Sequence, residues 1–116
     1  MQGPHHLIAD AKCTGGLDDS RKVLAFACAV VEATGLKTQQ TVFQEFPNGT
    51  QFGPGITVLH LLSESHLALH TAPERGYLNL DLYSCKVFDP SLIWGLLEEH
   101  FGVERLDRWD VLWRHG

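Results

Sequence analysis

The sequence predicts an α+β two-layer sandwich, in which an antiparallel sheet carries two helices packed on one of its faces. Three observations predict this fold class. The chain has 116 residues, enough for a single domain with one modest core. Of these residues, 44% are hydrophobic and 20% are charged, as in an ordinary globular protein. Strand-like and helix-like segments follow one another in the order β-α-β-β-β-α-β.

The N-terminal third of the chain predicts one strand and one helix. Residues 5–11 form a short apolar strand that is followed by glycine-rich turn residues. Asp18, Asp19 or Ser20 then caps a helix, and Gly35 ends it. Apolar side chains recur between these caps at helical spacing, which predicts one buried face: Val23, Phe26, Ala27, Val30 and Val31.

The middle of the chain predicts two strands separated by a long loop. Residues 38–46 are rich in Thr, Val and Phe, which favour strands. Residues 47–55 contain Pro, Asn and Gly in turn patterns and predict the loop of a hairpin. Residues 56–62 are a near-continuous apolar run, which is typical of a strand covered on both faces. This strand leads directly to Glu64 and Ser65.

The C-terminal third predicts a strand, a helix and an edge strand. Residues 77–83 alternate leucines with polar side chains, so the leucines share one buried face. Asp89 caps a second helix, Pro90 lies in its first turn and Gly102 ends it. Residues 103–113 place apolar side chains at strand parity and add the edge strand.

Composition and charge exclude several classes of partner. The net charge of −5 argues against nucleic acid, which needs a basic face. No apolar run approaches the ~18 residues of a membrane helix, and the N-terminal residues do not resemble a signal peptide. Cys13, Cys28 and Cys85 lack the spacing of a disulfide framework or a metal site. We therefore expect a cytoplasmic protein in which Cys13 and Cys28 are small buried residues.

The residues that could carry chemistry gather in the second half of the chain. Ser65 is followed by His70 five residues later and by Cys85 twenty residues later. These residue types supply nucleophiles and proton shuttles near neutral pH. Taken one at a time, these residues have simpler interpretations. Ser65 would be a turn serine, and His60 would be a hydrogen-bonded sheet histidine. His66 and His70 lack the further ligands of a metal site. The motif Glu-Ser-His followed by His-Thr-x-Pro-Glu is more specific than these separate interpretations.

This motif resembles the prokaryotic S-adenosylmethionine decarboxylase proenzyme family, and the resemblance covers most of the chain. It implies a chain that makes its own covalent pyruvoyl cofactor, without PLP and without a metal. Ser65 would attack the carbonyl of Glu64 and convert the peptide bond into an ester. Elimination and hydrolysis would then leave a β chain of residues 1–64 and an α chain of residues 65–116 that begins with the pyruvoyl group.

The resemblance also implies roles for single residues. His70 would be the base for elimination, Thr57 would assist processing, and Cys85 would return a proton to the substrate after carbon dioxide leaves. Glu74 and Phe46 would bind the substrate, an amino acid whose amine forms a Schiff base with the pyruvoyl group. The enzyme would be a homodimer of cleaved protomers in polyamine synthesis, with sites near the subunit interface.

Two positions depart from the family pattern. Ala72 stands where the family usually has an aromatic wall for an adenine ring, and Gln44 stands in place of a histidine. Stacking on an aromatic ring contributes about 1–3 kcal/mol. Either another ring (Phe46, Phe52 or Tyr77) replaces the wall, or the same chemistry acts on ornithine or arginine. A further alternative is an unprocessed homologue that acts as a binding or regulatory subunit.

Overall fold

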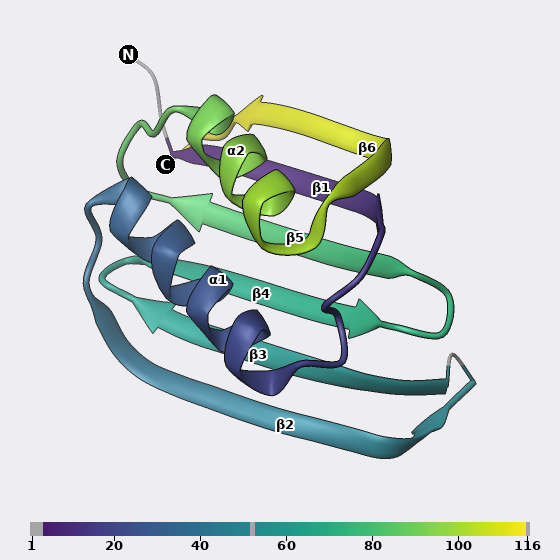
Figure 1. Ribbon diagram of the computed structural model, residues 1–116. Helices are drawn as coiled ribbons and strands as arrows, with labels where there is room; N and C mark the ends of the chain where they lie inside the picture. The colour runs from purple at the N-terminus through teal and green to yellow at the C-terminus, as the bar shows by residue number, and fades with distance from the viewer. Residues whose placement is uncertain (1–3, 52, 116) are drawn as a thin grey trace.

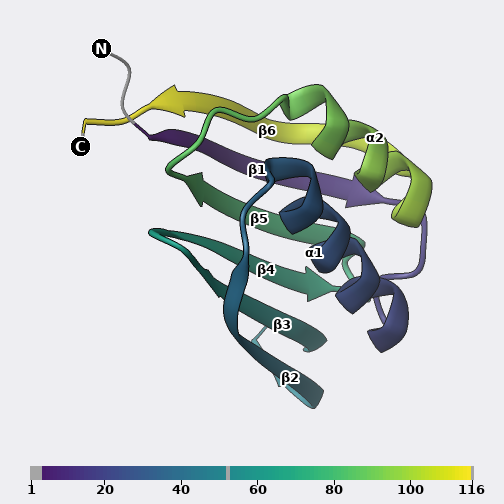
Figure 2. The same cartoon turned by 90° about the vertical axis from the view of Figure 1, so that its left-hand side faces the viewer.

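The fold is one six-stranded antiparallel sheet with two helices on the same face of the sheet (Figure 1 and Figure 2). A computed structural model describes residues 4–51 and 53–115. The strands lie side by side in the order β2-β3-β4-β5-β1-β6. In chain order the elements are β1 His5–Cys13, α1 Ser20–Thr34, β2 Thr38–Thr50, β3 Gly53–Leu62, β4 Ser65–Ala72, β5 Tyr77–Ser84, α2 Pro90–Phe101 and β6 Val103–Trp113.

Both helices begin and end at predicted residues. The Asp19 side chain accepts hydrogen bonds from two backbone N–H groups in the first turn of α1. Gly35 closes α1 with a φ of 73°, a left-handed conformation that favours glycine because glycine has no Cβ. The Asp89 side chain caps α2 by accepting a hydrogen bond from the backbone N–H of Ser91, and Pro90 is the first residue of this helix. Neither helix in the described part of the chain is long and apolar enough to cross a membrane.

The core lies between the helices and the sheet. The rings of Phe26 on α1 and Phe101 on α2 meet edge to face, with centroids 5.2 Å apart. Alternate residues of the central strands face the helices, including the predicted row of Leu78, Leu80 and Leu82, each at most 2% exposed. This packing fixes which face of each strand is buried. The residues of opposite parity are left on the other side of the sheet, here called the open face.

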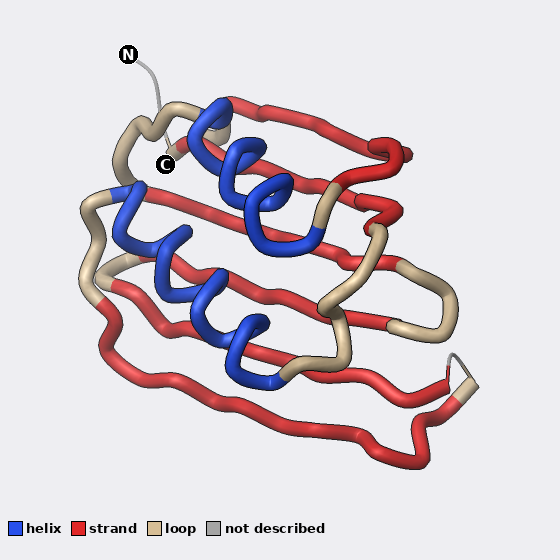
Figure 3. The backbone as a smooth tube through the Cα atoms, in the orientation of Figure 1, coloured by secondary structure: helices blue, strands red, loops and turns tan. Residues whose placement is uncertain are grey.

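Two expectations for the strands are wrong. Ser65–Ala72 forms an additional strand, β4, which pairs with both β3 and β5. Residues 47–55 are not a long loop, because β2 continues to Thr50 and β3 begins at Gly53 (Figure 3). Pro47 is compatible with β2 because β2 is an edge strand, where a missing backbone donor can face solvent.

The open face carries an apolar patch on β2 and β3. The sequence predicts that β3 is covered on both faces, but Leu59 and Leu61 are 41% and 52% exposed. Val42 is the cross-strand partner of Leu59 and is 55% exposed. The expectation is wrong for a single chain because both helices cover the same side of the sheet. We refer to Val42, Leu59 and Leu61 as the apolar patch.

Candidate active site

The Glu64–Ser65 bond lies at the tight turn that joins β3 to β4. Leu62 pairs with Ser65, so Ser63 and Glu64 alone form the turn. Glu64 has a φ of 56°, the only positive value among the non-glycine residues of the described ranges. A residue with a Cβ in this conformation is less stable by about 1–2 kcal/mol. The backbone is therefore strained directly next to the predicted cleavage bond.

Cys85 contacts this turn through two of its atoms. Its backbone N–H donates a hydrogen bond to Ser65 Oγ at 2.8 Å, and its thiol lies 3.6 Å from the carbonyl oxygen of Ser63. Ser65 is buried on the helix side of the sheet, whereas Cys85 is exposed. The fold therefore brings together two of the predicted site residues that are twenty positions apart.

The other two cysteines lie apart from this turn. Cys13 is buried as predicted, and burial raises the pKa of its thiol to about 11. Cys28 is exposed, so the expectation that it is buried is wrong. Position 28 follows Ala27, and one residue further along a helix is enough to leave the buried face.

His70 lies farther along β4 and faces a different direction. Its side chain is exposed on the open face, and its Nδ1 lies 3.0 Å from Thr57 Oγ1 on β3. Thr57 and His70 are direct cross-strand partners, so the register of the sheet sets this contact. A hydrogen bond at one ring nitrogen orients the imidazole and determines which nitrogen can exchange a proton with a substrate.

A single chain does not bring Ser65 and His70 together. They are five positions apart on one strand, which corresponds to about 16 Å along the strand. The odd separation also directs the two side chains to opposite faces of the sheet. In Figure 1 the β3–β4 connection lies at one end of the sheet and the β4–β5 connection lies at the other. The predicted site is therefore divided between two ends of the molecule.

A cavity of about 650 Å³ opens beside His70 on the open face. Cavities of about 300–1,000 Å³ are the usual size for small-molecule sites. Thr57 and the predicted substrate residue Phe46 contribute to its lining. Ala72 and its cross-strand partner Tyr77 also line it. The position that departs from the family pattern is thus part of the cavity wall, next to an aromatic ring.

The ring of Tyr77 is held firmly at the edge of this cavity. Its hydroxyl donates a hydrogen bond to the Asp107 carboxylate and accepts one from Arg105 Nη2 at 2.9 Å. The Lys12 ammonium lies 5.4 Å from the ring centroid, within the range of a cation–π contact. The hydrogen bonds from Tyr77 and Arg105 lower the pKa of Asp107, which therefore stays charged at neutral pH.

Glu74, the second predicted substrate residue, lies in the β4–β5 turn. Glu74 is exposed, and its carboxylate lies close to Gly53. A side chain at position 53 would place its Cβ only 2.9 Å from Glu74 Oε2. Because Gly53 lines the cavity, the Glu74 carboxylate stands at the cavity rim. Phe52, one of the three rings considered as a replacement wall, lies outside the described residues. Gln44 is exposed on β2 as the partner of Thr57.

Sequence reasoning missed several polar residues of the cavity wall, among them Asp10 and Asn79. Asn79 donates a hydrogen bond to Asp10 at 2.7 Å, and Arg108 lies 3.8 Å from the same carboxylate. Asp10 and Asn79 both line the cavity. The polar face of residues 77–83 was a signal for Asn79, but only the pairing of β1 with β5 joins it to Asp10.

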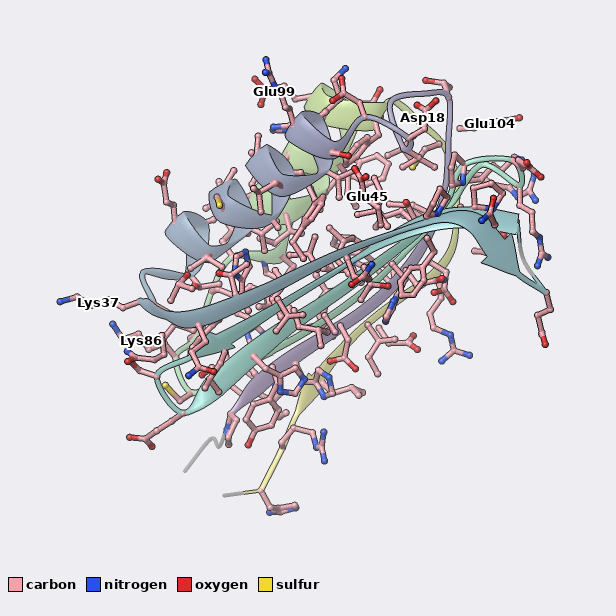
Figure 4. All side chains as sticks on the ribbon, turned by 90° about the horizontal axis from the view of Figure 1, so that it is seen from below. Asp18, Lys37, Glu45, Lys86, Glu99 and Glu104 are labelled. Carbon is pink, nitrogen blue, oxygen red and sulfur yellow. The ribbon has the colours of Figure 1, made fainter. Side chains whose placement is uncertain are left out.

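Two lysines lie at the end of the sheet that carries the β3–β4 turn. Figure 4 shows Lys37 and Lys86 at one end of the molecule and Asp18 and Glu104 at the other. The backbone N–H of Ser63 donates to the carbonyl of Lys37, which places this turn at the Lys37 end. Within residues 4–51 and 53–115, no group of three or more His, Cys, Asp or Glu side chains could hold a metal ion.

A comparison with protein families identifies the chain. A sequence model of the family described as S-adenosylmethionine decarboxylase matches residues 5–113. The chain belongs to the S-adenosylmethionine decarboxylase family. The resemblance that the Glu64-Ser65 motif indicates is therefore confirmed, and it extends over nearly the whole chain.

Relatives in this family match the chain over different lengths. A Brevibacillus brevis protein named S-adenosylmethionine decarboxylase proenzyme is 59% identical over 44 residues, 36% of this chain and 33% of that protein. The Geobacillus kaustophilus protein of that name is 38% identical over 55 residues, 47% of this chain and 44% of the relative. These two alignments span less than half of each relative. A Clostridium botulinum protein of the same name is 26% identical over 111 residues, 93% of this chain and 91% of the relative.

Proposed function

We propose that this chain is the proenzyme of a pyruvoyl-dependent S-adenosylmethionine decarboxylase of polyamine synthesis. The observation that supports this most is the geometry at the cleavage turn, where a left-handed Glu64 precedes a serine whose Oγ is held by the Cys85 amide. Intramolecular attack on a peptide bond needs both a strained backbone and a positioned hydroxyl. Family membership supports the use of this geometry for self-cleavage.

The first step converts the Glu64–Ser65 peptide bond into an ester. Ser65 Oγ forms a bond to the Glu64 carbonyl carbon, the C–N bond breaks, and the hydroxyl proton passes to the Ser65 nitrogen. A base, for which His70 is the proposed residue, then takes the Ser65 Cα proton while the Cβ–Oγ bond breaks. This step releases residues 1–64 with a terminal carboxylate and leaves a Cα=Cβ double bond at position 65. Addition of water and loss of ammonia leave residues 65–116 with a pyruvoyl group in place of Ser65.

The pyruvoyl group supplies an electron sink for the loss of carbon dioxide from an amino acid. The cavity beside His70 binds and orients the rest of the substrate. Phe46 and Tyr77 provide its aromatic walls, and the Glu74 carboxylate at the rim accepts hydrogen bonds from substrate hydroxyl or amine groups. The Cys85 thiol, adjacent to the cleavage turn, donates the proton that replaces carbon dioxide.

A second copy of the chain completes the site. His70 cannot reach Ser65 of its own chain, because about 16 Å of β4 lie between them. When two open faces pack together about a two-fold axis perpendicular to the strands, the strands of the two sheets run in opposite directions. The His70 end of one chain then lies over the Ser65 end of the other. The apolar patch provides a hydrophobic contact for such a homodimer.

Intact mass of the purified protein tests self-cleavage. Chains of residues 1–64 and 65–116 are expected, and the second should be blocked to Edman degradation. The Ser65→Ala variant should remain a single chain. A wild-type chain that also stays whole contradicts the proposal.

Release of labelled carbon dioxide tests the substrate. S-adenosylmethionine should be turned over, and ornithine and arginine should not. Loss of a stacking ring in Tyr77→Ala should raise KM for S-adenosylmethionine about tenfold or more. Tyr77→Phe keeps the ring and should retain a KM near that of the wild type. An unchanged KM in Tyr77→Ala would show that this ring is not the wall.

Co-expression of two defective variants tests the shared site. Ser65→Ala cannot cleave, and His70→Ala lacks the proposed base. In a mixed dimer the intact His70 of the Ser65→Ala chain faces the intact Ser65 of the His70→Ala chain. A tagged His70→Ala chain should therefore cleave only when the Ser65→Ala chain is present. Absence of rescue would contradict the two-chain site.

A further inference from the structure

The cleavage turn is anchored by groups outside its own hairpin. Ser63 makes three such contacts. Its N–H donates to the Lys37 carbonyl at 3.3 Å, its Oγ accepts a hydrogen bond from Gln39 Nε2 at 3.0 Å, and its carbonyl oxygen lies 3.6 Å from the Cys85 thiol. The first residue of the turn is therefore fixed to β2 on one side and to the segment after β5 on the other.

Gln39 reaches the turn through an irregularity in the sheet. Thr38 is opposite Leu62 and Gln40 is opposite Leu61, so Gln39 is an extra residue in the β2–β3 ladder. An extra residue of this kind is a β-bulge, which redirects side chains and recurs beside active sites. In this chain, the inserted residue is the one whose amide bonds to the cleavage turn.

These anchors concentrate the backbone strain at Glu64. Ser63 is fixed by the contacts above, and Ser65 is fixed by the Cys85 amide. Glu64 lies between them with its φ at 56°. The attack of Ser65 lengthens the link by one atom, because the ester path from the Glu64 carbonyl carbon to the Ser65 Cα runs through Oγ and Cβ. Ester formation therefore relieves a strain that the anchors otherwise maintain.

We propose that Gln39 is a positioning residue for self-cleavage, which holds Ser63 so that the strain at Glu64 is relieved by the attack of Ser65 on the peptide bond. This inference rests on the proposed self-cleavage of the chain. Gln39 acts through Ser63 and does not touch the reacting atoms. Its loss therefore slows processing and leaves decarboxylation by the processed enzyme unchanged.

The test is a time course of cleavage after cell-free synthesis of the full chain, sampled on denaturing gels. Gln39→Ala should cleave about two- to tenfold more slowly than the wild type, the range expected for one exposed hydrogen bond. Gln40→Ala, at an adjacent and also exposed position of β2, should cleave at the wild-type rate. Glu64→Gly should also be slow, because glycine adopts a left-handed φ without strain.

A double variant separates this role from a general structural one. If Gln39 acts through Ser63, the double variant Gln39→Ala with Ser63→Ala should cleave no more slowly than Ser63→Ala alone. After complete processing, carbon dioxide release per pyruvoyl group should be the same in Gln39→Ala and the wild type. Equal cleavage rates in Gln39→Ala and the wild type, or additive losses in the double variant, overturn the inference.

The possible failures are distinguishable. A wild-type chain that never cleaves contradicts the proposed function rather than the role of Gln39. If Gln39→Ala lacks a cooperative thermal transition, this variant is not folded, and the cleavage rates of Ser63→Ala and Glu64→Gly test the inference instead. Wild-type cleavage rates in both of these variants overturn the inference, and slow cleavage in both supports it.

Discussion

The buried His60 should make the stability of this fold depend on pH. Its side chain is 2% exposed, and its Nδ1 lies 2.8 Å from Thr41 Oγ1. Its Nε2 is the one buried side-chain polar atom of the described residues without a hydrogen-bond partner. The expectation of a hydrogen-bonded sheet histidine is therefore correct for only one of the two ring nitrogens.

Burial lowers the pKa of His60, because the charged ring would lose its hydration. An unfolded chain binds this proton with a pKa of about 6.5. As the pH falls below that value, the unfolded state takes up a proton that the folded state does not bind. The free energy of unfolding therefore decreases, by at most about 1.4 kcal/mol per pH unit, until the pH reaches the lowered pKa of the folded state.

The variant His60→Leu removes both the titrating group and the unpaired nitrogen. Relative to its parent, it should lose less stability as the pH falls below about 6.5, by up to about 1 kcal/mol over the first pH unit. It should also gain stability at neutral pH, since an unsatisfied buried polar atom costs about 1–3 kcal/mol. Part of this gain is offset by loss of the contact with Thr41.

Urea unfolding followed by tryptophan fluorescence measures these differences. A Ser65→Ala background keeps every sample as one uncleaved chain. His115→Leu, at an exposed position, is the matched control and should keep the pH dependence of the parent. Burial also lowers the pKa of His5, but this contribution is common to all the variants and cancels. Equal pH dependence in His60→Leu and its parent would refute the burial argument.

Three further predictions concern the thiols, the core and a helix cap. A thiol reagent at neutral pH should label Cys28 and Cys85 rapidly but not Cys13, whose pKa is raised to about 11. Peptide mass spectrometry measures the labelling, and rapid labelling of Cys13 would contradict the prediction. Leu69→Ala, at a position with 0% exposure, should lower the free energy of unfolding by about 2–5 kcal/mol in urea titrations. Asp19→Ala should lower the free energy of unfolding by about 1 kcal/mol, because α1 loses its N-cap. If Leu69→Ala or Asp19→Ala loses no stability, the role assigned to that residue is wrong.

Local patterns were sufficient for the helices and for most of the strands. The caps at Asp19 and Gly35 and the apolar stripe between them act within one helix, so the sequence alone predicts α1. Residues 65–72 also alternate in burial, but an extended segment becomes a strand only when neighbours pair with it. Here β3 and β5 supply those neighbours, and local sequence does not specify either pairing.

The same distinction holds for the site. The sequence by itself determined the residue types and the motif spacing of Glu64, Ser65, His70 and Cys85, and these were enough to identify the family. Only the tertiary structure decided that Ser65 meets Cys85 and does not meet His70. It also decided that a bulge directs Gln39 to the turn between β3 and β4. The physical reason is that strand parity and cross-strand pairing, rather than distance along the chain, determine which side chains come together.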